Sequence, residues 1–210
     1  MDVSPRFGEA LAWASKLHAR QMRKSKVGDR SVPYISHLLA VCALVWEDGG
    51  DEDEAIAALL HDAVEDQGVT TAQISRRFGD KVARIVMDCT DLVPDDPAAI
   101  RHWLPRKRAH IERVPGFGDD SLRVLAADKA HNATVMVWDA RDDPRSWDRF
   151  RGGLVGTAWY LVRMHALLEQ RLPQSRSVAK LALALDEFLK RYSLSRETLL
   201  TREPSALDLN

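Results

Sequence analysis

The residues with the clearest chemical potential are a histidine–aspartate doublet, His61 and Asp62, inside an otherwise apolar helical pattern. Glu65 and Asp66 follow one turn later, and at 100° per residue all four side chains fall in one sector of a helix. Four ionisable groups on a core helix are costly to bury unless something pairs with them. A metal ion is a natural partner, because it compensates carboxylates and also accepts an imidazole nitrogen.

Two ligands from one segment do not complete a metal site, and two further candidates lie elsewhere. His37 and Asp128 are each an isolated polar residue in an apolar helical pattern. Each has a simpler interpretation alone: His37 as a hydrogen-bonded core histidine, and Asp128 as the partner of a neighbouring arginine. Together, however, His37, His61, Asp62 and Asp128 on separate helices predict one metal centre.

The elements that must position these residues are almost all helices. Apolar residues recur at helical spacing along the chain, and the alternation typical of strands is scarce. Glycines at 49–50, 68 and 79 predict helix ends, and Thr70 with Gln73 has the pattern of a capping box. We expect an all-α fold in a single domain spanning residues 1–210, with a loop at 94–97 and helices over 7–22, 35–45, 52–65, 71–78, 82–89, 98–113, 121–139 and 175–192.

Length and charge narrow the class of protein. The chain has 210 residues, of which 45% are apolar, and 31 acidic residues against 30 lysines and arginines. This near-neutral balance argues against a nucleic-acid partner bound through bulk charge. No apolar run approaches the about 20 residues of a membrane helix, the start lacks the pattern of a secretory signal, and two cysteines are too few for a disulfide framework. We therefore expect a cytoplasmic protein with no membrane partner.

The order of these ligands, a histidine, a later His-Asp doublet and a distant aspartate, resembles the HD phosphohydrolase superfamily. Residues 18–24, 33–37, 58–66 and 78–83 resemble the alarmone-hydrolase domain of RelA/SpoT homologues. Trp103 with 106–108, and the run 127–132, resemble the small alarmone hydrolases in particular. The resemblance covers about residues 7–168, and residues 175–200 read as a C-terminal helical extension.

The resemblance implies removal of the 3′-diphosphate from (p)ppGpp, a small-molecule nucleotide, to give GDP or GTP and pyrophosphate. It also implies Mn²⁺ as the usual metal, and two imidazoles with two carboxylates suit Mn²⁺, Fe²⁺, Co²⁺ or Zn²⁺. Glu65 and Asp66, one turn beyond the ligands, are expected to hold the attacking water or shuttle its proton. Asn132, one turn after Asp128, is expected near the ribose or the attacked phosphate.

A substrate with up to five phosphates needs compensating cations. The expected substrate-binding residues are Arg23, Lys24, Tyr34, Lys107, Lys129 and Arg151. In the family the base lies near the Arg-Lys pair, where a guanidinium can stack on its face. A supporting role is expected for His18 and Gln21.

Three departures from the family pattern keep alternatives open. The segment from Lys24 to Tyr34 is longer than usual, Leu38 stands where a proline is common, and residues 133–135 replace a more polar stretch. One alternative is an HD phosphohydrolase acting on another nucleotide, such as (p)ppApp or NADPH. Another is a non-catalytic nucleotide-binding module. The sequence leaves the oligomeric state open.

Overall fold

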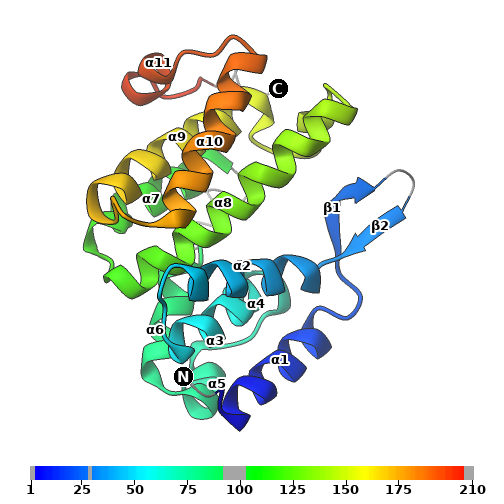
Figure 1. The fold of residues 1–210 in the computed structure, drawn as a ribbon, viewed down its shortest axis with the longest axis vertical. Coiled ribbons are helices and arrows are strands. Elements are labelled where there is room, and N and C mark those ends of the chain that lie inside the picture. The colour runs from blue at the N-terminus through cyan, green and yellow to red at the C-terminus, as the bar shows by residue number, and fades with distance from the viewer. Residues whose placement is uncertain (1–2, 28–29, 92–102, 206–210) are drawn as a thin grey trace.

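Helices make up nearly all of the computed structural model, which describes residues 3–27, 30–91 and 103–205 (Figure 1). This confirms the predicted all-α class. In chain order the elements are α1 (Pro5–Leu17), β1 (Met22–Val27), β2 (Arg30–Pro33), α2 (Ile35–Glu47), α3 (Glu52–Leu60), α4 (Ala63–Gln67), α5 (Thr71–Phe78), α6 (Asp80–Cys89), α7 (Trp103–Arg113), η2 (Val114–Gly116), α8 (Asp119–Asp142), η3 (Ser146–Arg149), α9 (Gly153–Arg171), α10 (Arg176–Arg191) and α11 (Arg196–Thr201).

A short hairpin corrects the prediction for the first helix. The helix ends at Leu17, and Met22 lies in β1, which pairs antiparallel with β2 and places Met22 opposite Pro33. Met22 is 49% exposed, so it extends no apolar helix face. His18 is buried but polar, and Ala19 and Arg20 are exposed, so these residues give a further helical turn no apolar side chain to bury. The hairpin projects from the helices (Figure 1).

A break at His61 and Asp62 corrects the predicted helix over 52–65. Helix α3 ends at Leu60, and α4 begins at Ala63. The His61 ring nitrogen Nδ1 lies 2.8 Å from the Ala58 carbonyl oxygen, which the Asp62 amide would bond in a continuous helix. Asp62 takes φ −98° and ψ 1°, a backbone region common in active sites. The chain therefore turns within the doublet.

Local capping fixes the helices on both sides of this break. A capping box of Asp51 and Glu54 starts α3, and the predicted box of Thr70 and Gln73 starts α5. Gly68 ends α4 with φ +65°, which side chains other than glycine rarely adopt. The doublet therefore lies between two helices with well-defined ends.

Two clusters of buried apolar side chains share helix α8. One cluster is built from α1 to α6 and takes Val124 and Ala127 of α8. The other is built mainly from α7 to α11 and takes Leu122 and Leu125 of α8. Helix α8, predicted over 121–139, spans 24 residues, long enough to cross both clusters.

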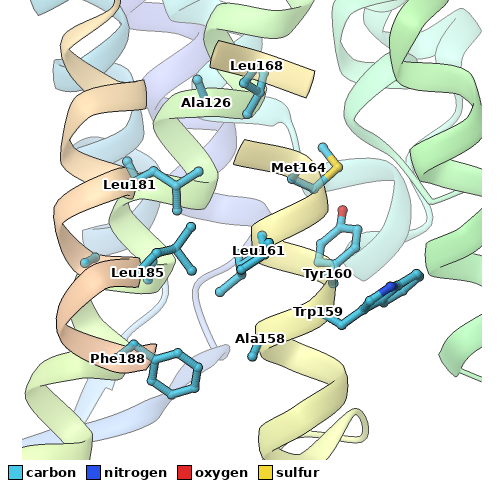
Figure 2. Close-up of a cluster of buried hydrophobic side chains, with 14 of the residues drawn as sticks. Ala126, Ala158, Trp159, Tyr160, Leu161, Met164, Leu168, Leu181, Leu185 and Phe188 are labelled. Carbon is cyan, nitrogen blue, oxygen red and sulfur yellow. The ribbon is translucent and has the colours of Figure 1, made fainter. Parts of the chain in front are cut away.

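Helices α9 and α10 complete the second cluster. Leu181 and Leu185 of α10 face Leu161 of α9, while Trp159 and Tyr160 lie on the other side of α9 (Figure 2). The predicted loop at 94–97 and the start of the predicted 98–113 helix fall outside the described residues, and α7 is described from Trp103. None of the described helices has the length and apolar character that crossing a membrane requires.

Candidate functional site

Three of the four predicted metal ligands meet between the two apolar clusters. His37 comes from α2, His61 from the end of α3 and Asp128 from α8. One ligand atom from each lies within 4.8 Å of the others, and the three residues are at most 6% exposed. The fold therefore brings together His37 and Asp128, which are 91 positions apart in the sequence.

The hydrogen bonds of the two imidazoles leave one nitrogen of each for a ligand. Nδ1 of His61 lies 2.8 Å from the Ala58 carbonyl oxygen, and Nδ1 of His37 lies 2.8 Å from Nδ1 of His131. Both Nε2 atoms are buried and have no hydrogen-bond partner among the described residues. They lie 3.2 Å (His37) and 3.7 Å (His61) from Asp128 Oδ1. Such orientation through the second ring nitrogen is typical of metal-binding histidines.

Asp62, the fourth predicted ligand, adjoins this cluster. Its Oδ2 lies 2.9 Å from His61 Nε2 and 3.8 Å from His37 Nε2, and it accepts a 2.5 Å hydrogen bond from the Tyr34 hydroxyl. Burial alone raises the pKa of Asp128, but the charge of Lys129 and the neighbouring imidazoles of His37 and His61 together outweigh burial and hold the pKa well below its usual range. Two imidazole nitrogens with ionised carboxylates form a donor set that fits a divalent transition metal.

A cavity of about 330 Å³ opens in front of Asp62 and Asp128. The three residues predicted to be catalytic, Glu65, Asp66 and Asn132, all line it. Asn132 Nδ2 donates to Asp128 Oδ1 at 2.5 Å, and Asn132 Oδ1 accepts from Arg23 Nη2 at 2.8 Å. Asn132 therefore connects the candidate metal ligand Asp128 to Arg23, one of the predicted cations.

The two acidic residues of α4 differ in their contacts. Glu65 is paired with Arg106, whose Nη1 lies 3.4 Å away, and partial burial together with the charge of Asp91 raises the pKa of Glu65. Asp66 accepts a 2.6 Å hydrogen bond from Gln21 Nε2, and burial raises its pKa also. A raised pKa brings a carboxyl group closer to the range in which it exchanges protons near neutral pH.

The contacts of Gln21 agree with the supporting role expected for it and for His18. Gln21 Oε1 lies 2.7 Å from His18 Nδ1 and accepts from Gln67 Nε2 at 2.6 Å. Its amide is therefore oriented so that its NH₂ group faces Asp66.

A second cavity, of about 620 Å³, adjoins the first. The two share Lys24, Lys107 and Lys129, together with Glu65, Asp66 and Asn132. Arg23 and Tyr34 line the first cavity alone, and Arg151 lines the second. All six predicted substrate-binding residues therefore face one cavity or both.

The three departures from the family pattern fall at different distances from these cavities. Most of the long segment from Lys24 to Tyr34 lies in strands β1 and β2, and the Arg23 guanidinium lies 5.6 Å from the centre of the Tyr34 ring. Leu38 is fully buried in the core. Val135, from the third departure, lines the first cavity.

Two residues near the site escaped the sequence prediction, His131 and Asp91. His131 follows Asp128 by three positions on α8, and this shared helix face is the signal that could have identified it. Asp91 follows the end of α6 and contacts Lys107 and His110 of α7. No periodicity points to it, because its partners come from a distant helix.

Comparison with known proteins decides the family. A family model described as HD domain matches residues 10–139, more than half of the chain. The chain belongs to the HD domain family. Membership of the HD domain family implies dependence on a divalent metal, which the donor set fits.

Several relatives of this HD-domain chain are named as 3′-pyrophosphohydrolases of guanosine-3′,5′-bis(diphosphate). The chain is 34% identical to the guanosine-3′,5′-bis(diphosphate) 3′-pyrophosphohydrolase MESH1 of Xenopus tropicalis over 145 residues. This alignment covers 68% of the chain and 74% of the relative. The human MESH1 is 33% identical over the same coverage. The bis(diphosphate) 3′-pyrophosphohydrolase of Aquifex aeolicus is 40% identical over 164 residues, which are 66% of the chain but 23% of that protein.

Solved structures agree with the sequence relatives. A structure described as a metazoan ortholog of SpoT that hydrolyses ppGpp matches with a TM-score of 0.68 and 27% identity, covering 93% of this chain and 99% of that one. A protein of Listeria monocytogenes matches with a TM-score of 0.64 and 28% identity, covering 73% and 99%. The resemblance to small alarmone hydrolases is confirmed.

Replacing His131 tests whether its contact with His37 orients His37 for metal binding. We expect His131→Phe to weaken divalent-metal affinity by about 10–100-fold, because His37 loses the partner of its Nδ1. Calorimetric metal titration measures the effect. His165→Phe is the matched control, since His165 is also a buried histidine but lies on α9 beside Glu169. Equal metal affinity in both variants would contradict the orienting role.

Proposed function

We propose that this HD-domain chain is a metal-dependent pyrophosphohydrolase that removes the 3′-diphosphate of (p)ppGpp. The single observation that carries the proposal is the convergence of His37, His61 and Asp128 beside a cavity whose wall also holds three lysines and an arginine among the described residues. The names of the Xenopus and human relatives support the same reaction.

The proposed metal is Mn²⁺, held by His37, His61, Asp62 and Asp128. Two imidazole nitrogens make the set softer than the all-oxygen sites that Mg²⁺ prefers. When bound, a divalent metal at this position polarises a phosphoryl group and lowers the pKa of water. Tyr34 orients Asp62, and Asn132 orients Asp128, so both carboxylates keep a defined direction.

Hydrolysis of the 3′-diphosphate consumes one water. The water oxygen bonds to the phosphorus next to the ribose, the bond from that phosphorus to the 3′-oxygen breaks, and the 3′-oxygen takes up a proton. Pyrophosphate and GDP or GTP leave. Glu65 lines both cavities and has a raised pKa, so we assign it as the acceptor of the proton from the attacking water. Asp66, its neighbour on α4, supports it.

The positions of the cations indicate which part of the substrate each cavity binds. Arg23 lies on β1 of the hairpin and is assigned to the base, because a guanidinium can stack on the face of a base. Lys24, Lys107 and Lys129 line both cavities, and Arg151 the second, so they are assigned to the phosphates.

A second candidate is hydrolysis of another nucleotide, such as (p)ppApp or NADPH. The observation that favours it is local: the long hairpin bears Arg23, and Val135 stands in the cavity wall where the family pattern is more polar. Both features border the region assigned to the base, so they bear on which base is accepted.

A nucleotide panel tests the function. With Mn²⁺ present we expect ppGpp and pppGpp to release pyrophosphate faster than (p)ppApp, and NADPH to release little phosphate. The readout is pyrophosphate or phosphate released by purified protein. Preference for ppApp or NADPH would favour the second candidate, and no turnover on any nucleotide would favour a non-catalytic binding module.

Metal removal tests the metal chemistry. EDTA should abolish turnover, and Mn²⁺ should restore it better than Mg²⁺, because imidazole ligands favour the softer ion. Activity is measured after exhaustive chelation and after adding each metal. Full activity after chelation would refute the metal-dependent mechanism.

Substituting Glu65 separates proton transfer from metal binding. Glu65→Gln keeps the size of the side chain but removes the proton acceptor, so kcat should fall by about 10²–10⁴-fold with metal content intact. Asp62→Asn should instead reduce metal content. In the unsubstituted protein, kcat should decline as pH falls through the raised pKa of Glu65. Loss of metal in Glu65→Gln would make Glu65 a ligand, and normal turnover would remove it from the mechanism.

A further inference from the structure

Asp91 is a buried carboxylate that the proposed mechanism does not use. It lies just beyond the end of α6 and is 4% exposed. Lys107 Nζ donates to its Oδ2 at 2.7 Å, and Arg106 Nη1 lies 3.5 Å from the same oxygen. His110 Nδ1 lies 3.0 Å from its Oδ1. Three side chains of α7 therefore converge on one carboxylate.

The backbone beside Asp91 is also held by α7. Arg113 donates to the carbonyl oxygens of Thr90 at 3.2 Å and Met87 at 3.3 Å. Burial alone raises the pKa of Asp91, but the hydrogen bonds and charges of His110 and Lys107 together outweigh burial and hold the pKa well below its usual range. Asp91 is therefore an ionised group in a fixed position.

Tyr160 supports the same cluster from α9. Its hydroxyl lies 3.1 Å from His110 Nδ1, and its ring lies 4.7 Å from Lys107 Nζ and 5.5 Å from Lys129 Nζ. Tyr160 lies on the side of α9 away from α10 (Figure 2). Lys107 is thus held by a carboxylate and by an aromatic ring, both favourable contacts for an ammonium group.

Cations outnumber carboxylates in the wall of the second cavity. Lys107 and Arg106 both pair with Asp91, Arg106 also pairs with Glu65, and Lys129 pairs with Asp128. Among the described residues that line this cavity there are five cations and two carboxylates: Lys24, Arg106, Lys107, Lys129 and Arg151, against Glu65 and Asp66. A cation-rich wall favours a bound anion, and phosphate oxygens are the anion that the proposed substrate offers.

We propose that Asp91, oriented by His110, is a positioning residue that holds Lys107 in a site for phosphate oxygens. This site is separate from the candidate metal ligands. The inference rests on the proposed function. The phosphate can come from two sources, the leaving pyrophosphate or the 5′-diphosphate of the nucleotide. Both present the same oxygens to Lys107, and the binding measurements below distinguish them.

Kinetics of Asp91→Asn test the positioning role. The variant keeps the size of the side chain and removes its charge, so KM for ppGpp should rise about tenfold, as for a lost charge-assisted contact, with kcat and metal content nearly unchanged. Lys107→Met should raise KM at least as much. Adding Asp91→Asn to Lys107→Met should change KM no further, because Asp91 acts through Lys107.

Asp48→Asn is the matched control. Asp48 accepts hydrogen bonds from Ser175 Oγ at 2.7 Å and from the Ser177 amide at 3.0 Å, far from the cavities, so this variant should lose stability without a change in KM. If Asp91→Asn fails to fold, His110→Leu replaces it, since it leaves Asp91 in place without its orienting partner. Unchanged KM in the folded variant, or fully additive effects with Lys107→Met, would overturn the proposal.

Direct binding distinguishes the two phosphate sources and separates this inference from the proposed function. GDP and inorganic pyrophosphate are titrated calorimetrically into EDTA-treated protein and its Asp91→Asn variant. Weaker binding of GDP alone assigns the 5′-diphosphate to Lys107, and weaker binding of pyrophosphate assigns the leaving group. Equal binding of both probes in the two proteins overturns the site. Because this readout needs no turnover, it stands even if ppGpp is not hydrolysed.

Discussion

Burying ionisable groups without a compensating partner is the constraint on which this structure depends. His37, His61 and Asp128 each cost free energy to bury, and the chain buries all three within 4.8 Å of one another. The costs cancel only where the groups share a partner, and a divalent cation meets both imidazole nitrogens and the carboxylate. The break between α3 and α4 follows from the same constraint, because it turns His61 and Asp62 toward one point.

The helices of the two apolar clusters supply different residues of the site. The cluster of α1 to α6 supplies His37 and the His61–Asp62 doublet, whereas α7 and α9 supply Lys107 and Tyr160. Helix α8 passes between them and carries Asp128, Lys129 and Asn132. The candidate metal ligands therefore come from α2, α8 and the turn after α3, whereas α7 adds Lys107 to the cations that line the cavities.

The sequence predicts those parts of the site whose signal is local. His37 and Asp128 are conspicuous because each interrupts an apolar pattern, and Thr70 and Gly79 mark helix boundaries by their own backbone chemistry. The hairpin and the break at the doublet are different, since the His61 ring takes the Ala58 carbonyl only in the folded packing. Asp91 shows the same limit, because its partners lie 15 or more positions away on α7.

Helix α8 also bears on how the molecule unfolds. Because it belongs to both apolar clusters, neither can separate from it without exposing side chains that the other buries. A ligand that binds across His37, His61 and Asp128 binds the folded chain and not the unfolded one, so it adds stability by mass action, about 2.7 kcal/mol at a free concentration 100 times its Kd. The metal centre is then a reversible crosslink between α2, α3 and α8, and the resistance of the chain to heat depends on the metal supply of its surroundings.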